Sequence, residues 1–341
     1  MTNYKSMLYL LLLVLIVILP TQPNYASTEK VSGKITGVVS HPMPNWFKDS
    51  FLDFADDVDE ATSKGKHVML FFHLEACPYC TRMLVESFEP ELLSKRIQKD
   101  FDVIEVNIKG DRLIQFNETL ALSEKQLAET LGVQATPAIV FLNKDNKFIT
   151  RVNGYRSPSR FEQVLNYVST NAYASVSLES YMQENLKRNV YTLRDHSLFS
   201  SDTDLSVDGP VAVIIEDTSC NDCAELHARM LGRDDILQQL EKFTVIRFNA
   251  ETDAQIRGLD GQVTNVREFI SHHKILYRPA ILLIDDATIV KRYDSLPFSY
   301  HFREGLRFVA DGFYKNELYK DYSERRRDEL LAAGVNINYK E

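Results

Sequence analysis

Four cysteines are the residues whose type and spacing point most directly to chemistry. They are all the cysteines of the 341-residue chain, and they form two Cys-x-x-Cys pairs, Cys77–Cys80 and Cys220–Cys223. A structural disulfide usually joins distant segments, whereas a pair this close in sequence closes a very small loop and constrains the unfolded chain little. The spacing therefore predicts thiol–disulfide exchange at both pairs.

Metal binding is the main alternative for these cysteines. Two Cys-x-x-Cys pairs can form a zinc site with four cysteine ligands, but such pairs normally lie ~15–20 residues apart. Here 139 residues separate Cys80 from Cys220. The sequence therefore predicts no metal ion and no cofactor other than the redox-active disulfides themselves.

A strand that leads into a Cys-x-x-Cys helix places the first sulfur at the helix N-terminus. Free amide groups and the helix dipole stabilise negative charge there, so the pKa of that thiol falls. We therefore expect Cys77 to attack a client disulfide and Cys80 to resolve the mixed disulfide. Pro78 suits the first helical position. Pro78 and Tyr79 are predicted to contact the client, although Tyr79 could equally be an exposed aromatic.

A proline opens a second apolar run in each half, in the dipeptides Thr136-Pro137 and Arg278-Pro279. Proline at the start of a strand lacks the donor that a sheet requires, so it needs a special reason to be there. In thioredoxin-like folds the reason is a cis bond that faces the cysteines and leaves the preceding backbone free to pair with an extended client. Both dipeptides are therefore predicted to bind the client.

The second cysteine pair has acidic neighbours in the sequence, namely Glu216, Asp217, Asp222 and Glu225. Negative charges disfavour a thiolate, and Arg278 would offset part of this effect if it points at the sulfurs. We therefore expect the first pair to meet clients. The second pair is expected to react more slowly, tuned for a relay partner or an anionic ligand.

The chain contains one unit twice. Four stretches match four later ones at offsets of 141 to 143 residues: 67–80 with 210–223, 101–107 with 243–249, 136–142 with 278–284, and 161–168 with 302–309. A repeat of this length indicates duplicated domains, because the units of solenoids are ~20–50 residues long.

The pattern of apolar and turn residues in the first unit predicts strand, helix, strand, helix, hairpin and helix, in that order. The expected strands are 68–72, 103–108, 137–142 and 148–152, and the expected helices are 81–87, 123–131 and 159–168. Further helices are expected at 49–62, 173–188 and 314–333. The order predicts an α/β fold of two tandem thioredoxin-like domains, at 27–188 and 189–341. Each is expected to be a central mixed sheet flanked by helices.

The beginning of the chain has the pattern of an export signal. Lys5 precedes an apolar run at 7–19, Pro20 ends the run, and Ala26 offers a small residue for cleavage. The run is shorter than the ~20 residues that span a bilayer. We therefore predict a signal peptide at 1–26, a periplasmic location and no stable membrane association after cleavage, with an uncleaved anchor as the alternative. The net charge of −9 and the lack of a basic stripe argue against nucleic-acid binding.

The segment 44–184 closely resembles the long periplasmic thioredoxin-related proteins of the SoxW type. The resemblance rests on the stretches NWFKDSFLDFADDV, FFHLEACPYC, VIEVNIKGDR, LGVQATPAIVFL, RVNGY and LNYVSTNAY. It implies that Cys77 and Cys80 are the redox pair and Pro137 the cis-proline. It also implies a role in keeping partner thiols reduced beside a bacterial sulfur-oxidation system. The second half matches mainly through the internal repeat, and its Cys-Asn-Asp-Cys lacks the usual proline.

Both halves depart from an ordinary thioredoxin. Ala76 or Ser219 stands where a thioredoxin has a tryptophan, and Phe71 or Ile214 stands where it has a buried acid. The sequence therefore predicts that a buried proton acceptor is missing, which would slow turnover. His73, on the strand before Cys77, is either a proton shuttle or simply packed.

These patterns together predict a periplasmic thiol–disulfide oxidoreductase. The expected activity is reduction of disulfides in protein clients, with electrons from a membrane donor. The direction of electron flow stays open, because the potential depends on electrostatics at the helix end. The alternatives are a disulfide-forming oxidase or isomerase, and a redox-inert adaptor or holdase, above all for the second domain.

Overall fold

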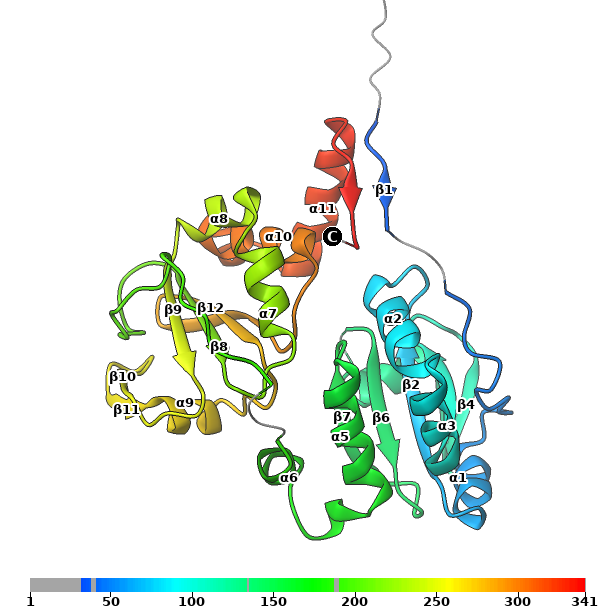
Figure 1. The fold of residues 1–341 in the computed structure, drawn as a ribbon. Helices are drawn as coiled ribbons and strands as arrows, with labels where there is room; N and C mark the ends of the chain where they lie inside the picture. The colour runs from blue at the N-terminus through cyan, green and yellow to red at the C-terminus, as the bar shows by residue number, and fades with distance from the viewer. Residues whose placement is uncertain (1–31, 38–40, 134, 187–189, 341) are drawn as a thin grey trace, which may run out of the picture.

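The computed structural model describes residues 32–37, 41–133, 135–186 and 190–340. The predicted signal peptide at 1–26 and the predicted domain boundary at 188/189 lie outside the described residues. Within these ranges no helix is both long enough and apolar enough to cross a membrane. The chain forms two units that lie side by side (Figure 1). The first runs from α1 (Phe54–Ser63) to α6 (Leu178–Glu184), and the second from β8 (Val211–Glu216) to α11 (Tyr319–Ala332).

The first unit is built on a four-stranded mixed sheet. Its strand order is β3 (Phe101–Asn107), β2 (His67–His73), β6 (Ala138–Leu142) and β7 (Phe148–Asn153). β2 runs parallel to β3, while β6 runs antiparallel to both β2 and β7. The five residues of β6 are all buried, as expected for a central strand that is covered on both faces.

Helices cover both faces of this sheet. They are α1 (Phe54–Ser63), α2 (Pro78–Met83), α3 (Glu91–Asp100), α4 (Glu124–Thr130) and α5 (Pro158–Ser169). Alternate residues of β2 enter different cores, because side chains of a strand point to opposite faces. Met69 and Phe71 belong to the core that contains both cysteines of the first pair, whereas Leu70 and Phe72 pack beside α1 and α4.

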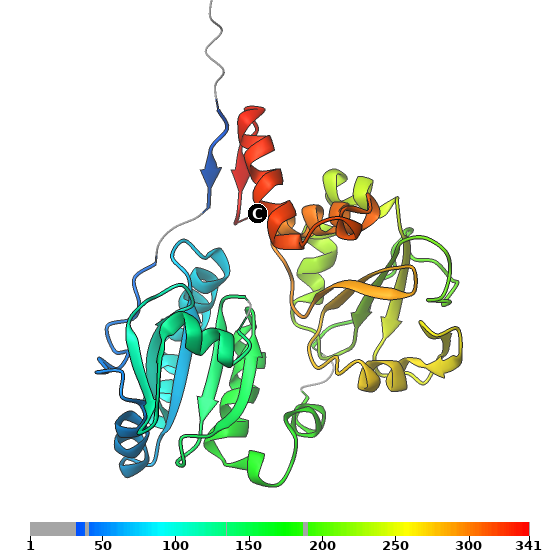
Figure 2. The same cartoon turned by 180° about the vertical axis from the view of Figure 1, so that it is seen from behind.

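The second unit repeats this design. Its strand order is β9 (Thr244–Asn249), β8 (Val211–Glu216), β12 (Ala280–Asp285) and β13 (Thr288–Tyr293), with the same strand directions. Its helices are α7 (Cys223–Glu225), α8 (Asp234–Leu240), α9 (Val266–His272), α10 (Ser299–Ala310) and α11 (Tyr319–Ala332). The view from behind also shows the two sheets in separate units (Figure 2). The predicted fold class, α/β with mixed sheets flanked by helices, is confirmed.

The helix that follows each cysteine pair widens into a π-helical turn. These turns are η1 (Leu84–Phe88) in the first unit and η3 (Leu226–Met230) in the second. π-Helical turns are rare and concentrate at functional sites. The matching position of the two turns extends the likeness between the units to the helices that follow their cysteine pairs.

Three predicted helices have other bounds in the structure, and two of them are divided. The helix expected at 49–62 begins only at Phe54, because the Asp53 side chain caps it by accepting hydrogen bonds from Ala55 and Asp56. The helix expected at 173–188 is divided into a short 3-10 turn, Ala172–Ala174, and α6 (Leu178–Glu184). The helix expected at 314–333 is divided in the same way, into Phe313–Lys315 and α11.

Several elements were not predicted. They are α3, α8 and α9, the hairpins β4 (Leu113–Asn117) with β5 (Leu120–Ser123) and β10 (Gln255–Arg257) with β11 (Val263–Asn265), and the strands β1 and β14.

β1 (Ile35–Thr36) and β14 (Ile337–Asn338) tie together segments that are far apart in the sequence. They pair in parallel beside α11 (Figure 1). The Gly33 amide donates to the Leu331 carbonyl at 2.8 Å, and a Cβ at position 33 would lie 2.1 Å from the Val335 carbonyl oxygen. Glycine is therefore required for this close approach.

Candidate functional site

The first cysteine pair forms a disulfide at the start of α2. Cys77 is the N-cap residue, and its sulfur accepts a hydrogen bond from the Cys80 amide at 3.1 Å. Pro78 occupies the first turn of α2, as predicted. In the reduced protein the same amide and the helix dipole would stabilise a thiolate at Cys77.

The proline loop lies against this sulfur. The Thr136-Pro137 bond is cis, and the Thr136 hydroxyl donates a hydrogen bond to the Cys77 sulfur at 3.3 Å. Thr136 therefore both borders the cysteine pair and supplies a second donor to the atom that would carry the negative charge. The structure thus brings together two of the predicted client-binding residues and the predicted nucleophile.

An open pocket of about 310 Å³ lies on another side of the disulfide. Both cysteines line it, together with His41, His73 and Asn107. His73 is paired with the Glu105 carboxylate at 3.1 Å, and this contact lowers the pKa of Glu105. His73 therefore has a partner and also borders the pocket. His41 was not singled out from the sequence, because it lies far from the motif in the chain.

Tyr79, between the two cysteines, is not an exposed aromatic. Its hydroxyl accepts a hydrogen bond from the Phe298 amide at 2.8 Å, and the rings of Tyr79 and Phe298 lie 4.5 Å apart. Phe298 precedes α10 of the second unit. The structure thus places Tyr79 at the contact between the units.

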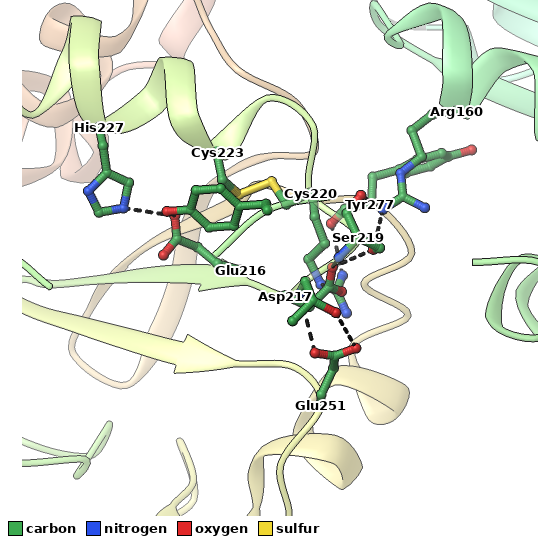
Figure 3. Close-up of a disulfide and its surroundings, with 12 residues drawn as sticks. Arg160, Glu216, Asp217, Ser219, Cys220, Cys223, His227, Glu251 and Tyr277 are labelled. Atoms are coloured by element: carbon green, nitrogen blue, oxygen red, sulfur yellow. Dashed lines mark hydrogen bonds and ion pairs between the residues drawn. A yellow bond between two sulfur atoms is a disulfide. The ribbon is translucent and has the colours of Figure 1, made fainter. Parts of the chain in front are cut away.

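The second cysteine pair also forms a disulfide, and it is buried more deeply (Figure 3). Cys220 and Cys223 are both 0% exposed, whereas Cys77 is 9% exposed. Tyr191 packs on this pair. The Arg278-Pro279 bond is cis, matching the bond in the first unit.

Arg278 is held within its own loop. It is 6% exposed, its Nε lies 3.1 Å from an Asp217 carboxylate oxygen, and it donates to the carbonyls of Ile275 and Tyr277. Asp217 also accepts a hydrogen bond from the Ser219 amide. Arg278 therefore offsets the charge of Asp217 and is largely buried, and its contact with a client stays a prediction.

Glu216, named from the sequence only as an acidic neighbour of the second cysteine pair, is a buried acid. It ends β8, is 0% exposed, and accepts a hydrogen bond from Tyr191 at 3.4 Å. His227 of η3 lies 3.0 Å from the same carboxylate (Figure 3). Burial raises the pKa of Glu216 to about 7 and lowers the pKa of His227.

The position of Glu216 explains why the sequence did not mark it as a buried acid. The buried acid of an ordinary thioredoxin corresponds to Ile214, which packs in the core of the second unit. Residues two apart in a strand share a face, so Glu216 lies on the face of Ile214 but nearer to the cysteines. The acid therefore stands two residues further along the strand than in an ordinary thioredoxin. The second unit therefore has a buried acid on this strand, and Tyr191 and His227 are its partners.

Glu216→Gln is expected to change how stability depends on pH. The folded protein holds the Glu216 proton more tightly than the unfolded chain does, because its pKa rises from 4.5 to about 7. The stability from this group is therefore fully present at low pH and is lost as the pH rises through about 7. Relative to the variant, the wild-type free energy of unfolding should fall by about 3 kcal/mol between pH 4.5 and pH 8.

Urea unfolding at several pH values measures this difference. Glu241→Gln is the matched control, because Glu241 lies in the same unit and is exposed. Parallel pH profiles for the wild type and Glu216→Gln would show that folding does not raise the pKa of Glu216.

No metal site stands out in the described ranges, where no three His, Cys, Asp or Glu side chains are grouped so as to hold an ion.

Comparison with known proteins identifies the first unit. Residues 54–169 match the family model of the thioredoxin-like domain. A search of curated proteins found no match.

Similar solved structures include three bacterial proteins. A thioredoxin-fold protein from Helicobacter pylori is 26% identical over 35% of this chain and 84% of its own, with a TM-score of 0.32. A thioredoxin from Thermus thermophilus is 23% identical over 40% and 87%, with a TM-score of 0.28. An exposed lipoprotein thioredoxin from Streptococcus pneumoniae is 24% identical over 34% and 96%, with a TM-score of 0.25. The family match and the strand order carry the assignment: this chain contains a thioredoxin-like domain, in the unit that holds Cys77 and Cys80.

Proposed function

We propose that the protein is a thiol–disulfide oxidoreductase in which Cys77 is the nucleophile and Cys80 the resolving cysteine. One observation carries the proposal: the Cys77 sulfur caps α2 and accepts hydrogen bonds from the Cys80 amide and the Thr136 hydroxyl. Hydrogen bonds to the charged form of a group favour that form. This geometry supports a thiolate at Cys77 near neutral pH.

The reaction is a two-electron exchange. The Cys77 thiolate attacks one sulfur of a client disulfide, and the other client sulfur leaves as a thiolate that takes up a proton. The Cys80 thiol loses its proton and attacks the Cys77 sulfur of the mixed disulfide. The client leaves with two thiols, and the protein keeps the Cys77–Cys80 disulfide. A dithiol donor then restores the starting state by the same steps in reverse.

The direction that we favour is reduction of protein disulfides in the periplasm, with electrons from a membrane donor. The support is the resemblance of residues 44–184 to SoxW-type proteins and the export pattern of the first 26 residues. A role beside sulfur oxidation follows from the same resemblance. Tandem duplication is part of the proposal, because strand order and both cis-prolines recur in the second unit.

The reduction potential of each cysteine pair tests this proposal. The protein is equilibrated in dithiol buffers of graded potential, alkylated and analysed by mass, and reduction of insulin is followed in parallel. A Cys77–Cys80 value near ~−270 mV with insulin reduction supports a reductase, whereas a value near ~−120 mV indicates a disulfide-forming oxidase. A pair that does not cycle with dithiothreitol would contradict both.

A redox-inert second unit is the other candidate, because Cys220 and Cys223 have no exposed surface. We expect iodoacetamide to label Cys77 of the reduced protein at least about tenfold faster than Cys220, since alkylation requires an accessible thiolate. Mass analysis of the labelled peptides over time gives the two rates. Faster labelling of Cys220 would contradict both its burial and the proposed division of labour.

A further inference from the structure

The two units contact each other through equivalent parts. In each unit the contact involves the Cys-x-x-Cys motif and the beginning of the long helix that follows the last strand of the sheet. This helix is α5 in the first unit and α10 in the second. The start of α10 touches the motif of the first unit, and the start of α5 touches the motif of the second. The contact is therefore reciprocal, with each redox motif covered by the other unit.

The second unit covers the first motif with aromatic side chains. Besides the Phe298 contacts already described, the Tyr79 hydroxyl lies 3.4 Å from His301 Nδ1. Arg82, two residues after Cys80, places its guanidinium 5.8 Å from the centre of the Phe298 ring. The Tyr79 hydroxyl accepts from an amide and so can donate to His301, which satisfies its polar group within the contact.

The first unit covers the second motif with polar side chains. Arg160 donates to the Ser219 carbonyl at 3.2 Å and to the Ser219 hydroxyl at 2.7 Å (Figure 3). The Asn221 side chain donates to the Ser159 hydroxyl at 2.6 Å. Arg160 and Ser219 are both buried, so these hydrogen bonds are shielded from water. Ser219 and Asn221, which make these contacts, flank Cys220 in the sequence.

An ion pair joins the two motifs. Arg82 and Glu225 each stand two residues after the resolving cysteine of their own unit, and a guanidinium nitrogen of Arg82 lies 3.7 Å from a carboxylate oxygen of Glu225. Asp222 is enclosed at the same place, where burial raises its pKa to about 6 while Arg82 and Arg160 oppose the shift. Equivalent positions that face each other indicate a contact with approximate two-fold symmetry.

We propose that this reciprocal contact is an autoinhibitory latch that makes Cys77 selective by substrate size. The proposal rests on the oxidoreductase activity proposed above. In the closed form a protein disulfide is kept from the first motif, because α10 of the second unit lies against it. A small disulfide still reaches the sulfurs through the open pocket beside Cys77. Separation of the units exposes both motifs together.

Opening the latch from the second unit tests this proposal without altering the first redox motif. The variant is Phe298→Ala, and the matched control is Phe313→Ala, whose ring packs on Tyr322 within the second unit. Both are supplied with dithiothreitol, and rates are measured on insulin and on oxidised glutathione. Phe298→Ala should reduce insulin about tenfold faster than wild type and glutathione disulfide at an unchanged rate, because it shifts the population towards the open form.

A second measurement does not depend on turnover. In the reduced protein, iodoacetamide should label Cys220 several-fold faster in Phe298→Ala than in wild type, because opening one half of a reciprocal contact frees the other. Unchanged insulin reduction and unchanged Cys220 labelling would overturn the latch and leave the proposed function intact. If neither substrate is reduced by wild type or variant, the proposed function fails and the latch with it.

Discussion

Cys77→Ser is expected to lower the rate of disulfide exchange on glutathione disulfide by at least about 10³-fold, because the variant lacks the sulfur nucleophile. Cys80→Ser should keep the first step and lose the second. It should therefore accumulate a mixed disulfide with its client, which Cys77→Ser cannot form. Non-reducing gel electrophoresis after mixing with an oxidised client, followed by mass analysis, detects this species.

Cys220→Ser is the matched control for this experiment. Its cysteine occupies the equivalent position in the second unit and is fully buried. We expect it to retain most of the activity on glutathione disulfide. Equal losses for Cys77→Ser and Cys220→Ser would mean that electrons pass through both pairs, and loss only in Cys220→Ser would reverse our assignment of the nucleophile.

Arg278→Met is expected to lower the free energy of unfolding by about 3–5 kcal/mol, because it leaves a buried carboxylate without its partner. That carboxylate belongs to Asp217, which is 3% exposed. Arg278 also donates to two backbone carbonyls, so their hydrogen bonds are lost as well. Urea unfolding followed by fluorescence or circular dichroism measures the change.

The double variant Asp217→Asn with Arg278→Met separates charge from packing. Removing both charges should restore much of the lost stability, since an ion pair replaced as a whole costs far less than one that is broken. If Arg278→Met alone costs less than about 1 kcal/mol, Asp217 does not depend on Arg278 and water or another group satisfies it.

The strands and the cysteine motifs could be predicted from the sequence because their signals are local. The apolar stretch of β2 is too short for a helix and ends at His73, shortly before the cysteine motif, and Cys77 caps the helix that begins at Pro78. The cis-prolines were also predictable, because a proline opening an apolar run recurs at matching distances from both cysteine pairs, and thioredoxin-like folds hold such a proline in the cis form. The strands and motifs needed only neighbouring residues and the repeat, whereas the cis form needed the likeness to that fold.

Glu216 and the contact between the units could not be predicted in this way. The role of Glu216 depends on which face of β8 it occupies and on how near the cysteines it lies, and both follow from the register of the strand. The hydrogen bond from Phe298 to Tyr79 joins residues 219 positions apart. No local pattern marks either partner, because an aromatic residue beside a redox motif looks the same whether a client or a second domain covers it.

The pairing of β1 with β14 imposes an order on folding. The Lys34 amide donates to the side chain of Asn336, which lies 302 residues later. β1 therefore has no partner until the last residues of the second unit have folded. A two-residue strand cannot hold its conformation alone, so the amide of Lys34 should be among the last to gain protection from hydrogen exchange. Its protection would report that the second unit has been completed and joined to the beginning of the first.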